Sequence, residues 1–216
     1  MKKIILSLVS LTFLFTASAW AQKFPATLKM HDGSTQTGIV SLPKNTEKKI
    51  SFTPEGGKTI KVPSADIALM TITNKNGYIS EFEYVPVFTT RSVINATYDK
   101  VQGYAWLVIK TRGYVTLYSS HFSSFWEGRE LPEFSHYCRR ESEKAVSLIA
   151  TSSPSPTSFG HNKNFKKLAN VYFADDQTII DKIADGTFTN KNLVELVTEY
   201  NSRNNNKYVV PSKPKR

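Results

Sequence analysis

Turn-forming dipeptides that contain glycine recur between short runs of β-branched and aromatic residues over the first 150 positions. They are Asp32-Gly33, Gly56-Gly57, Asn76-Gly77 and Arg112-Gly113. Such dipeptides supply the positive φ angles of tight hairpins, so their spacing predicts an antiparallel β region over residues 22–150. The expected hairpins pair residues 50–53 with 59–62, 67–73 with 78–87, 104–109 with 114–118, and 135–141 with 144–150.

The segment from 27 to 72 carries a further pattern. Five short runs of strand-forming residues follow one another within it, and the last is preceded by Pro63-Ser64-Ala65-Asp66. This order fits a small SH3-like barrel, and it fits an open meander with the same turns equally well. The sequence therefore predicts an antiparallel meander or a small SH3-like barrel.

The periodicity changes after residue 150. Serine, threonine and two prolines dominate residues 151–158 and cannot continue a β-ladder, so a linker is expected over residues 151–162. Apolar residues then recur at helical spacing, which predicts a cluster of about three helices over residues 163–204. The predicted fold class is α+β, with the helices after the β region.

Candidate caps mark the ends of these helices. Asp175 or Asp176 is placed to cap the second helix, and Gly186 is placed to end it in a left-handed conformation. Thr189 or Asn190 is placed to cap the third helix. Helices this short do not persist alone, so we expect them to pack on one another and on the sheet.

The first 21 residues have the composition of a secretory signal peptide. Lys2 and Lys3 precede an apolar run over residues 4–15, and Ala19-Trp20-Ala21 supplies the small-residue cleavage pattern. The run is shorter than the apolar stretch that a membrane-spanning helix needs, and no cysteine follows the cleavage position to accept a lipid. We therefore expect an exported protein, periplasmic or extracellular, without a transmembrane segment in the mature chain.

The formal net charge of +10 does not by itself indicate a nucleic-acid-binding surface. Two of the positive charges belong to the signal peptide, and five more lie between Arg203 and Arg216. The body between them carries only about +3, with lysines and acids interleaved, so no specific nucleic-acid partner is expected. Residues 205–216 are expected to form a basic, disordered tail.

Cys138 is the only cysteine, so no internal disulfide can form. The position is expected to be a small buried residue in a strand. An intermolecular bridge or a reactive thiol is the alternative.

Two parts of the chain are similar to one group of bacterial proteins. The helical part carries Phe165-Lys166-Lys167-Leu168, then Tyr172 to Asp176, and the β part carries Val115-Thr116-Leu117-Tyr118 and the stretch from Tyr137 to Glu141. Together they resemble short exported proteins of Bacteroidota, in which a cysteine often stands at the position of Asp176. The resemblance implies an envelope or secreted protein of β-plus-helix architecture, and it implies no activity, cofactor or site residue.

Few residue patterns indicate catalysis or metal binding. The chain has no nucleophile elbow, and Ser123 and Ser124 after His121 have no acid placed to orient a base. The four histidines lack the spacing of a metal site, so no metal and no cofactor are expected. Convergence of His121 and His136 on neighbouring strands is the alternative that stays open.

Aromatic side chains along the predicted 104–118 hairpin form the one candidate binding surface. An exposed face of this kind would stack on sugars or bases, whereas under the helices it would be core. The speculative ligand-binding residues are Tyr104, Trp106, Tyr114, Tyr118 and Trp126.

The leading hypothesis is a non-enzymatic envelope protein that acts as an interaction or structural module, with another envelope protein or a glycan as its partner. The alternative is a module that binds a glycan or another amphipathic ligand through the aromatic face. A hydrolase is the third and least supported hypothesis.

Overall fold

The computed structural model describes residues 23–90, 98–120, 122–126, 129–153 and 160–205. Side chains are described over the same ranges except 89–90, 98–100, 122–126 and 129–133. The predicted signal peptide, the predicted tail beyond residue 205 and His121 lie outside the described residues.

The N-terminal lobe consists of five short antiparallel strands. They are β1 (Lys23–Met30), β2 (Thr35–Ser41), β3 (Lys49–Pro54), β4 (Ile60–Pro63) and β5 (Ile67–Thr73). A 3₁₀ turn over Ser64–Asp66 connects β4 to β5. Because β1 pairs with both β2 and β5, the spatial order in this lobe is β5-β1-β2-β3-β4.

The remaining strands continue the same sheet. They are β6 (Ile79–Thr90), β7 (Tyr98–Thr111), β8 (Val115–Ser119), β9 (Phe122–Trp126), β10 (Arg129–Arg140) and β11 (Ser147–Ser152). The full order is β11-β10-β8-β7-β6-β5-β1-β2-β3-β4, and β9 pairs with β10 beside this path. All the strand pairs are antiparallel, which confirms the predicted antiparallel α+β class.

The predicted barrel over residues 27–72 is not closed. Among the described strands β4 pairs only with β3, so the ladder ends at β4 and the open alternative is the one observed. The four-residue length of β4 and Pro63 at its end leave little edge for a further ladder, because proline has no amide hydrogen to donate.

At the other end the sheet curls back on itself. Val146, just before β11, forms a parallel bridge with Val87 in β6. The Val146 amide donates to Pro86 O at 2.9 Å, and the Phe88 amide donates to Val146 O at 3.1 Å. This contact brings the last strand of the sheet against its middle.

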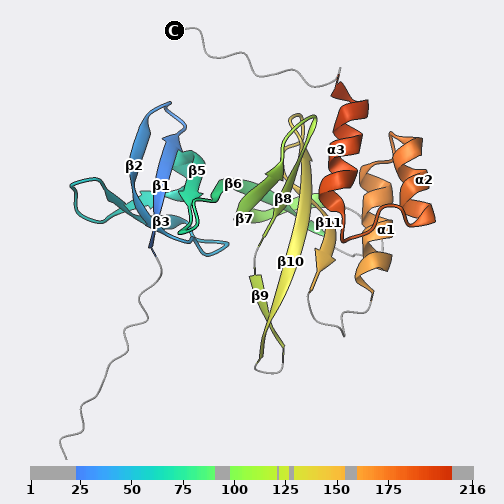
Figure 1. Ribbon diagram of the computed structural model, residues 1–216, viewed down its shortest axis with the longest axis horizontal. Coiled ribbons are helices and arrows are strands. Elements are labelled where there is room, and N and C mark those ends of the chain that lie inside the picture. Colours follow the sequence, from blue (N-terminus) through green and yellow to red (C-terminus); the bar gives the residue numbers. More distant parts are fainter. Residues whose placement is uncertain (1–22, 91–97, 121, 127–128, 154–159, 206–216) are drawn as a thin grey trace, which may run out of the picture.

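Three helices follow and cover the sheet near β8, β10 and β11 (Figure 1). They are α1 (His161–Tyr172), α2 (Gln177–Asp185) and α3 (Leu193–Arg203). β11 and α1 therefore reach into the stretch expected to be a linker. No helix in the described part of the chain has the length and apolarity needed to cross a membrane.

The caps of α2 are those predicted, and the cap of α3 is not. Asp176 accepts the amide hydrogens of Thr178 and Ile179, and Gly186 ends α2 with φ of 89°. The N-cap position of α3 is occupied by Asn192, not by Thr189 or Asn190. The Asn192 side chain accepts the Thr189 amide at 2.7 Å, so this polar cluster closes the preceding turn instead of capping α3.

The described core divides into three clusters. One fills the N-terminal lobe, where Phe52 and Met70 are fully buried. A second lies inside the curl around Leu107 and Tyr118. The third and largest lies between the sheet and the helices, and Cys138 is buried in it, as predicted.

One predicted turn depends on glycine for a reason other than its backbone angle. Gly33, Gly56 and Gly77 have positive φ, whereas Gly113 does not. A Cβ atom at position 113 would instead overlap the side chain of Asn201 in α3. The glycine therefore permits the close approach of a helix to the β7–β8 turn.

Candidate functional site

A pocket of about 550 Å³ lies between one end of the curled sheet and the start of α3. Its size falls within the range of small-molecule sites. Strands β7, β8, β10 and β11 form one wall, and the α2–α3 connection with the first turn of α3 forms the other. The lining residues are Lys110, Leu117, Ser119, Phe134, His136, Ser152, Ser153, Asn190, Lys191, Leu193, Val194 and Glu195.

A line of three hydrogen-bonded side chains crosses the sheet wall of this pocket. His136 in β10 lies opposite Ser119 in β8, and its Nδ1 is 2.8 Å from Ser119 Oγ. Its Nε2 is 2.9 Å from Ser152 Oγ in β11. In a neutral imidazole one ring nitrogen donates and the other accepts, so both nitrogens are satisfied without a proton being added.

The environment of His136 holds the ring in its neutral form. Burial, with a smaller contribution from the positive charge of Lys110, lowers its pKa to about 4. The ring is therefore uncharged at neutral pH. Its chemical role there is to accept or donate a hydrogen bond, not to supply a charge.

The charged side chains of the pocket lie at its rim. Lys110 and Lys191 line it, and both residues are exposed. Neither lysine forms an ion pair with any carboxylate whose side chain the structure describes. Glu195, in the first turn of α3, contributes the one acidic side chain of the lining.

Four apolar side chains also line the pocket, together with the polar Ser153 and Asn190. Leu117 and Leu193 are buried at its base, whereas Val194 remains 45% exposed. Phe134 adds an aromatic ring from β10. The pocket thus combines an apolar surface with a few hydrogen-bonding groups, which is the usual composition of a site for an amphipathic ligand.

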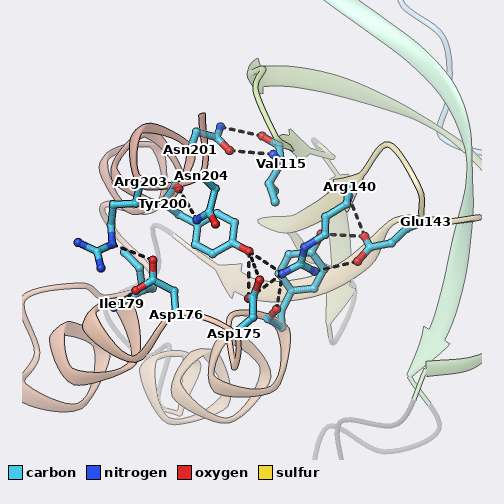
Figure 2. A network of polar contacts seen from close by, with 11 residues as sticks. Val115, Arg140, Glu143, Asp175, Asp176, Ile179, Tyr200, Asn201, Arg203 and Asn204 are labelled. Atoms are coloured by element: carbon cyan, nitrogen blue, oxygen red, sulfur yellow. Dashed lines mark hydrogen bonds and ion pairs between the residues drawn. The ribbon is translucent and has the colours of Figure 1, made fainter. Parts of the chain in front are cut away.

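The position of the helical wall depends on Arg140 in β10. Its guanidinium donates to Glu143 Oε1 at 2.9 Å, to Asp175 Oδ1 at 3.0 Å and to Tyr200 Oη at 2.8 Å (Figure 2). It also lies 4.5 Å from the ring centre of Tyr172. One cation therefore joins the β10–β11 turn to α1, the α1–α2 connection and α3.

A second contact fixes α3 against the sheet. The Asn201 side chain accepts the Val115 amide at 2.7 Å and donates to Val115 O at 2.8 Å (Figure 2). The amide group thus satisfies both backbone groups of a strand residue, as a neighbouring strand would. Arg140 and Asn201 together position α3, whose first turn forms the pocket wall.

The structure does not bring the five predicted aromatic residues onto one face. Trp106 is 3% exposed in the core of the N-terminal lobe, and its indole donates to Ser64 Oγ at 3.1 Å and to Glu47 O at 3.2 Å. Tyr118 is 1% exposed inside the curl, where its hydroxyl donates to Glu83 Oε2 at 2.7 Å.

The other three lie in separate places. Tyr114 packs under α3 with its ring 6.0 Å from that of Tyr200. Tyr104 is 51% exposed and stacks on Tyr84 at 5.4 Å. Trp126 ends β9 opposite Arg129, and its side chain lies outside the described residues.

The candidate metal and nucleophile positions can be followed only in part. Within the described ranges no three His, Cys, Asp or Glu side chains gather closely enough to hold a metal ion. Cys138 is fully buried, and that burial raises the pKa of its thiol. A test of convergence between His121 and His136 falls outside the described residues.

Sequence reasoning did not single out Ser119, His136 and Ser152 as a group. Their strands are separated in the chain, and the register that aligns them includes a bulge between His136 and Tyr137. A usable signal was nevertheless present. On β8 the apolar residues Val115 and Leu117 are followed by Ser119 on the same face, which indicates that the covered part of the face ends there.

Comparisons with known proteins do not add a relative to this picture. No protein-family model, no curated protein and no solved structure matches the chain. The function has to be inferred from the pocket and its surroundings.

Proposed function

We propose that the chain is an exported, non-enzymatic interaction module that holds a small amphipathic molecule in the pocket beside α3. The observation that carries this proposal is the mixed lining of a cavity of about 550 Å³, with Leu117, Phe134 and Leu193 beside the Ser119–His136–Ser152 line. A pocket of this volume and composition buries most of a small ligand and orients it through few polar contacts.

The electrostatics of the pocket favour binding over hydrolysis. The hydrogen bonds at His136 have the connectivity of a nucleophile–base–orienting group set, with Ser152 at Nε2 and Ser119 at Nδ1. A base of this kind becomes a cation in the transition state, and a carboxylate normally stabilises it. Here a hydroxyl stands in the carboxylate position, and Lys110 opposes the added charge.

Export is proposed from the first 21 residues, whose n-region, apolar run and cleavage pattern lie before the described structure. The resemblance to exported Bacteroidota proteins supports the same location, in the periplasm or outside the cell. In either place the pocket would meet small molecules of the envelope.

The N-terminal lobe is proposed to be an SH3-like unit in its strand order. The order β5-β1-β2-β3-β4, the 3₁₀ turn between β4 and β5, and the single core shared by all five strands support this proposal. Its role would be to support the long β6–β7 pair, since Trp106 of β7 packs into its core.

A second candidate surface lies on the outer part of the β6–β7 pair. Tyr104 is half exposed and stacks on Tyr84, which in turn lies 5.3 Å from Trp106. An exposed tyrosine supported from behind offers a flat platform for a sugar ring. This keeps glycan binding as an alternative, with Tyr104 as its central residue.

The proposal is tested by blocking the pocket. Val194 and Val171 are both half-exposed valines on helices, but only Val194 lines the pocket. Saturation-transfer NMR with a panel of oligosaccharides and C6–C10 alkyl compounds should detect at least one binder for the unmodified protein and for Val171→Trp. Binding should be lost in Val194→Trp.

Equal binding to both variants, or no binder in the panel, would contradict the pocket as the site. A binder that is lost in Tyr104→Ala but retained in Val194→Trp would favour the glycan surface instead.

A further inference from the structure

The charge and the hydrogen-bonding groups of the pocket point to one class of ligand. We propose that it binds a small amphipathic monocarboxylate, with the carboxylate paired to the ammonium groups of Lys110 and Lys191 and the apolar body against Phe134 and Val194. This inference rests on the proposed function, because it concerns the same pocket.

The net charge of the lining selects a monoanion. Two lysines face one glutamate, and His136 adds no charge at neutral pH, so one positive charge remains uncompensated. A carboxylate carries one negative charge at that pH. A phosphate monoester carries nearly two, so part of its charge would be left unpaired beside Glu195.

The lysines are available for this role within the described structure. Several carboxylates of that part of the chain pair with other cations, such as Glu199 with Lys182 and Asp176 with Arg203. Lys110 and Lys191 come from opposite walls, one from β7 and one from the connection before α3. A carboxylate between the walls would therefore be reached from both sides.

The polar groups between the lysines fit the same ligand. Asn190 is held at the pocket, because its side-chain nitrogen donates to Thr151 O at 3.3 Å. Neutral His136 accepts the hydrogen of one of the two hydroxyls, Ser119 or Ser152, so the other keeps its O–H to donate. That hydroxyl and the second amide hydrogen of Asn190 are neutral donors that complement a carboxylate without adding charge.

The apolar lining accounts for the rest of the ligand. Leu117 and Leu193 are buried, and Val194 is 45% exposed in the absence of a ligand. An alkyl or aromatic body would cover Val194 and Phe134 and remove their surface from water. A free inorganic anion would leave this surface uncovered, which is why an amphipathic ligand is proposed.

The test compares three probes of the same chain length. Isothermal titration of the purified full chain with octanoate, octanamide and octyl phosphate should give the tightest binding for octanoate. Octanamide should bind about tenfold more weakly, because it lacks the charge that pairs with the lysines.

Three variants locate the effect. Lys110→Gln and Lys191→Gln should each weaken octanoate binding by about fivefold and leave octanamide binding nearly unchanged. Lys29→Gln is the matched control, because Lys29 is an exposed lysine on β1 in the N-terminal lobe. All three positions are exposed, so the substitutions leave the core intact.

The outcomes separate this inference from the proposed function. If octanamide binds as tightly as octanoate and Val194→Trp abolishes both, the pocket is a ligand site but the monocarboxylate class is wrong. Tighter binding of octyl phosphate would overturn the monoanion argument. Absence of binding by all three probes would overturn the inference, and failure of the wider panel as well would overturn the proposed function.

Discussion

His136 is a half-buried titratable group whose neutral form is part of the folded structure. Its pKa is lowered to about 4 by burial and by Lys110, whereas the ordinary value is 6.5. The unfolded chain therefore takes up the proton first as the pH falls. The stability that depends on neutral His136 is complete above about pH 6.5 and is lost between there and pH 4.

The pH dependence that His136 gives to the stability can be measured. Over that window the free energy of unfolding should decrease by up to about 1.4 kcal/mol per pH unit because of this residue. In His136→Gln, whose side chain does not titrate, the decrease between about pH 6.5 and pH 4.5 should be smaller. Urea denaturation at a series of pH values measures the difference.

His31→Gln serves as the control, since His31 is exposed in the β1–β2 turn. It should retain the decrease of the unmodified protein. Parallel curves for the unmodified protein and His136→Gln would show that the hydrogen-bonded line does not control the titration.

At the scale of elements, the helical layer depends on a small number of polar contacts with the sheet. Arg140 is the main one, with a side chain that is only 15% exposed and that contacts Glu143, Asp175 and Tyr200. Removal of Arg140 takes away the cation that Glu143 and Asp175 share and opens space among the tyrosine rings.

Arg140→Met should therefore destabilise the protein by about 2–4 kcal/mol. Arg140→Lys should restore only part of this, because an ammonium group cannot reproduce the fork of the guanidinium. Lys144→Met, at an exposed position of the same turn, should change the free energy of unfolding by less than about 0.5 kcal/mol. A near-neutral Arg140→Met in urea denaturation would contradict the role assigned to the residue.

The elements were predictable where local chemistry determines them. Alternation and glycine turns were sufficient for the hairpins, and Asp176 and Gly186 marked the ends of α2 because caps act on adjacent backbone groups. The start of α3 was wrong by two to three residues, because Asn192 bonds backward to Thr189. The pairing of β1 with β5 and of β8 with β10 depends on contacts between residues that are distant in the chain. No local sequence pattern predicts these contacts.

At the scale of the whole molecule, the β6–β7 pair belongs to both the N-terminal lobe and a C-terminal lobe, which consists of strands β8–β11 and the three helices. On one face Phe82 and Trp106 enter the N-terminal core, and on the other face Val85 and Leu107 enter the core inside the curl. Apolar residues alternate on both sides of the strand around Trp106, which is typical of a strand covered on both faces. Because one pair of strands carries both cores, we expect the lobes to unfold together.

Trp106→Ala tests this coupling. Loss of the buried ring and of its bonds to Ser64 and Glu47 should cost about 3–5 kcal/mol. Far-UV circular dichroism and hydrogen exchange of the β8 amides should then report one transition, shifted to lower urea concentration for both signals. Two separate transitions, with β8 unaffected, would show that the lobes are independent.

The candidate site was less predictable than the fold. Trp106 and Tyr118 were candidate ligand-binding residues because they are aromatic residues on a hairpin. Their side chains are buried by parts of the chain that the local sequence pattern does not identify. The pocket residues come from five separate segments, among them the strand residues Lys110 and His136 and the helix residue Glu195. No short motif links such residues, so their convergence is a property of topology.

The strand order has a consequence for the sequence of events when the chain emerges with its N-terminus first. Strands β1–β5 pair with one another within the first 73 residues, so their ladder can form early, and Phe82 and Trp106 complete its core when β6 and β7 follow. The wall of the pocket formed by α3 is synthesised last, and Arg140 and Asn201 can fix it only after residue 201 is available. The pocket is therefore completed at the end of assembly, and shortening of the chain from its C-terminus removes it first.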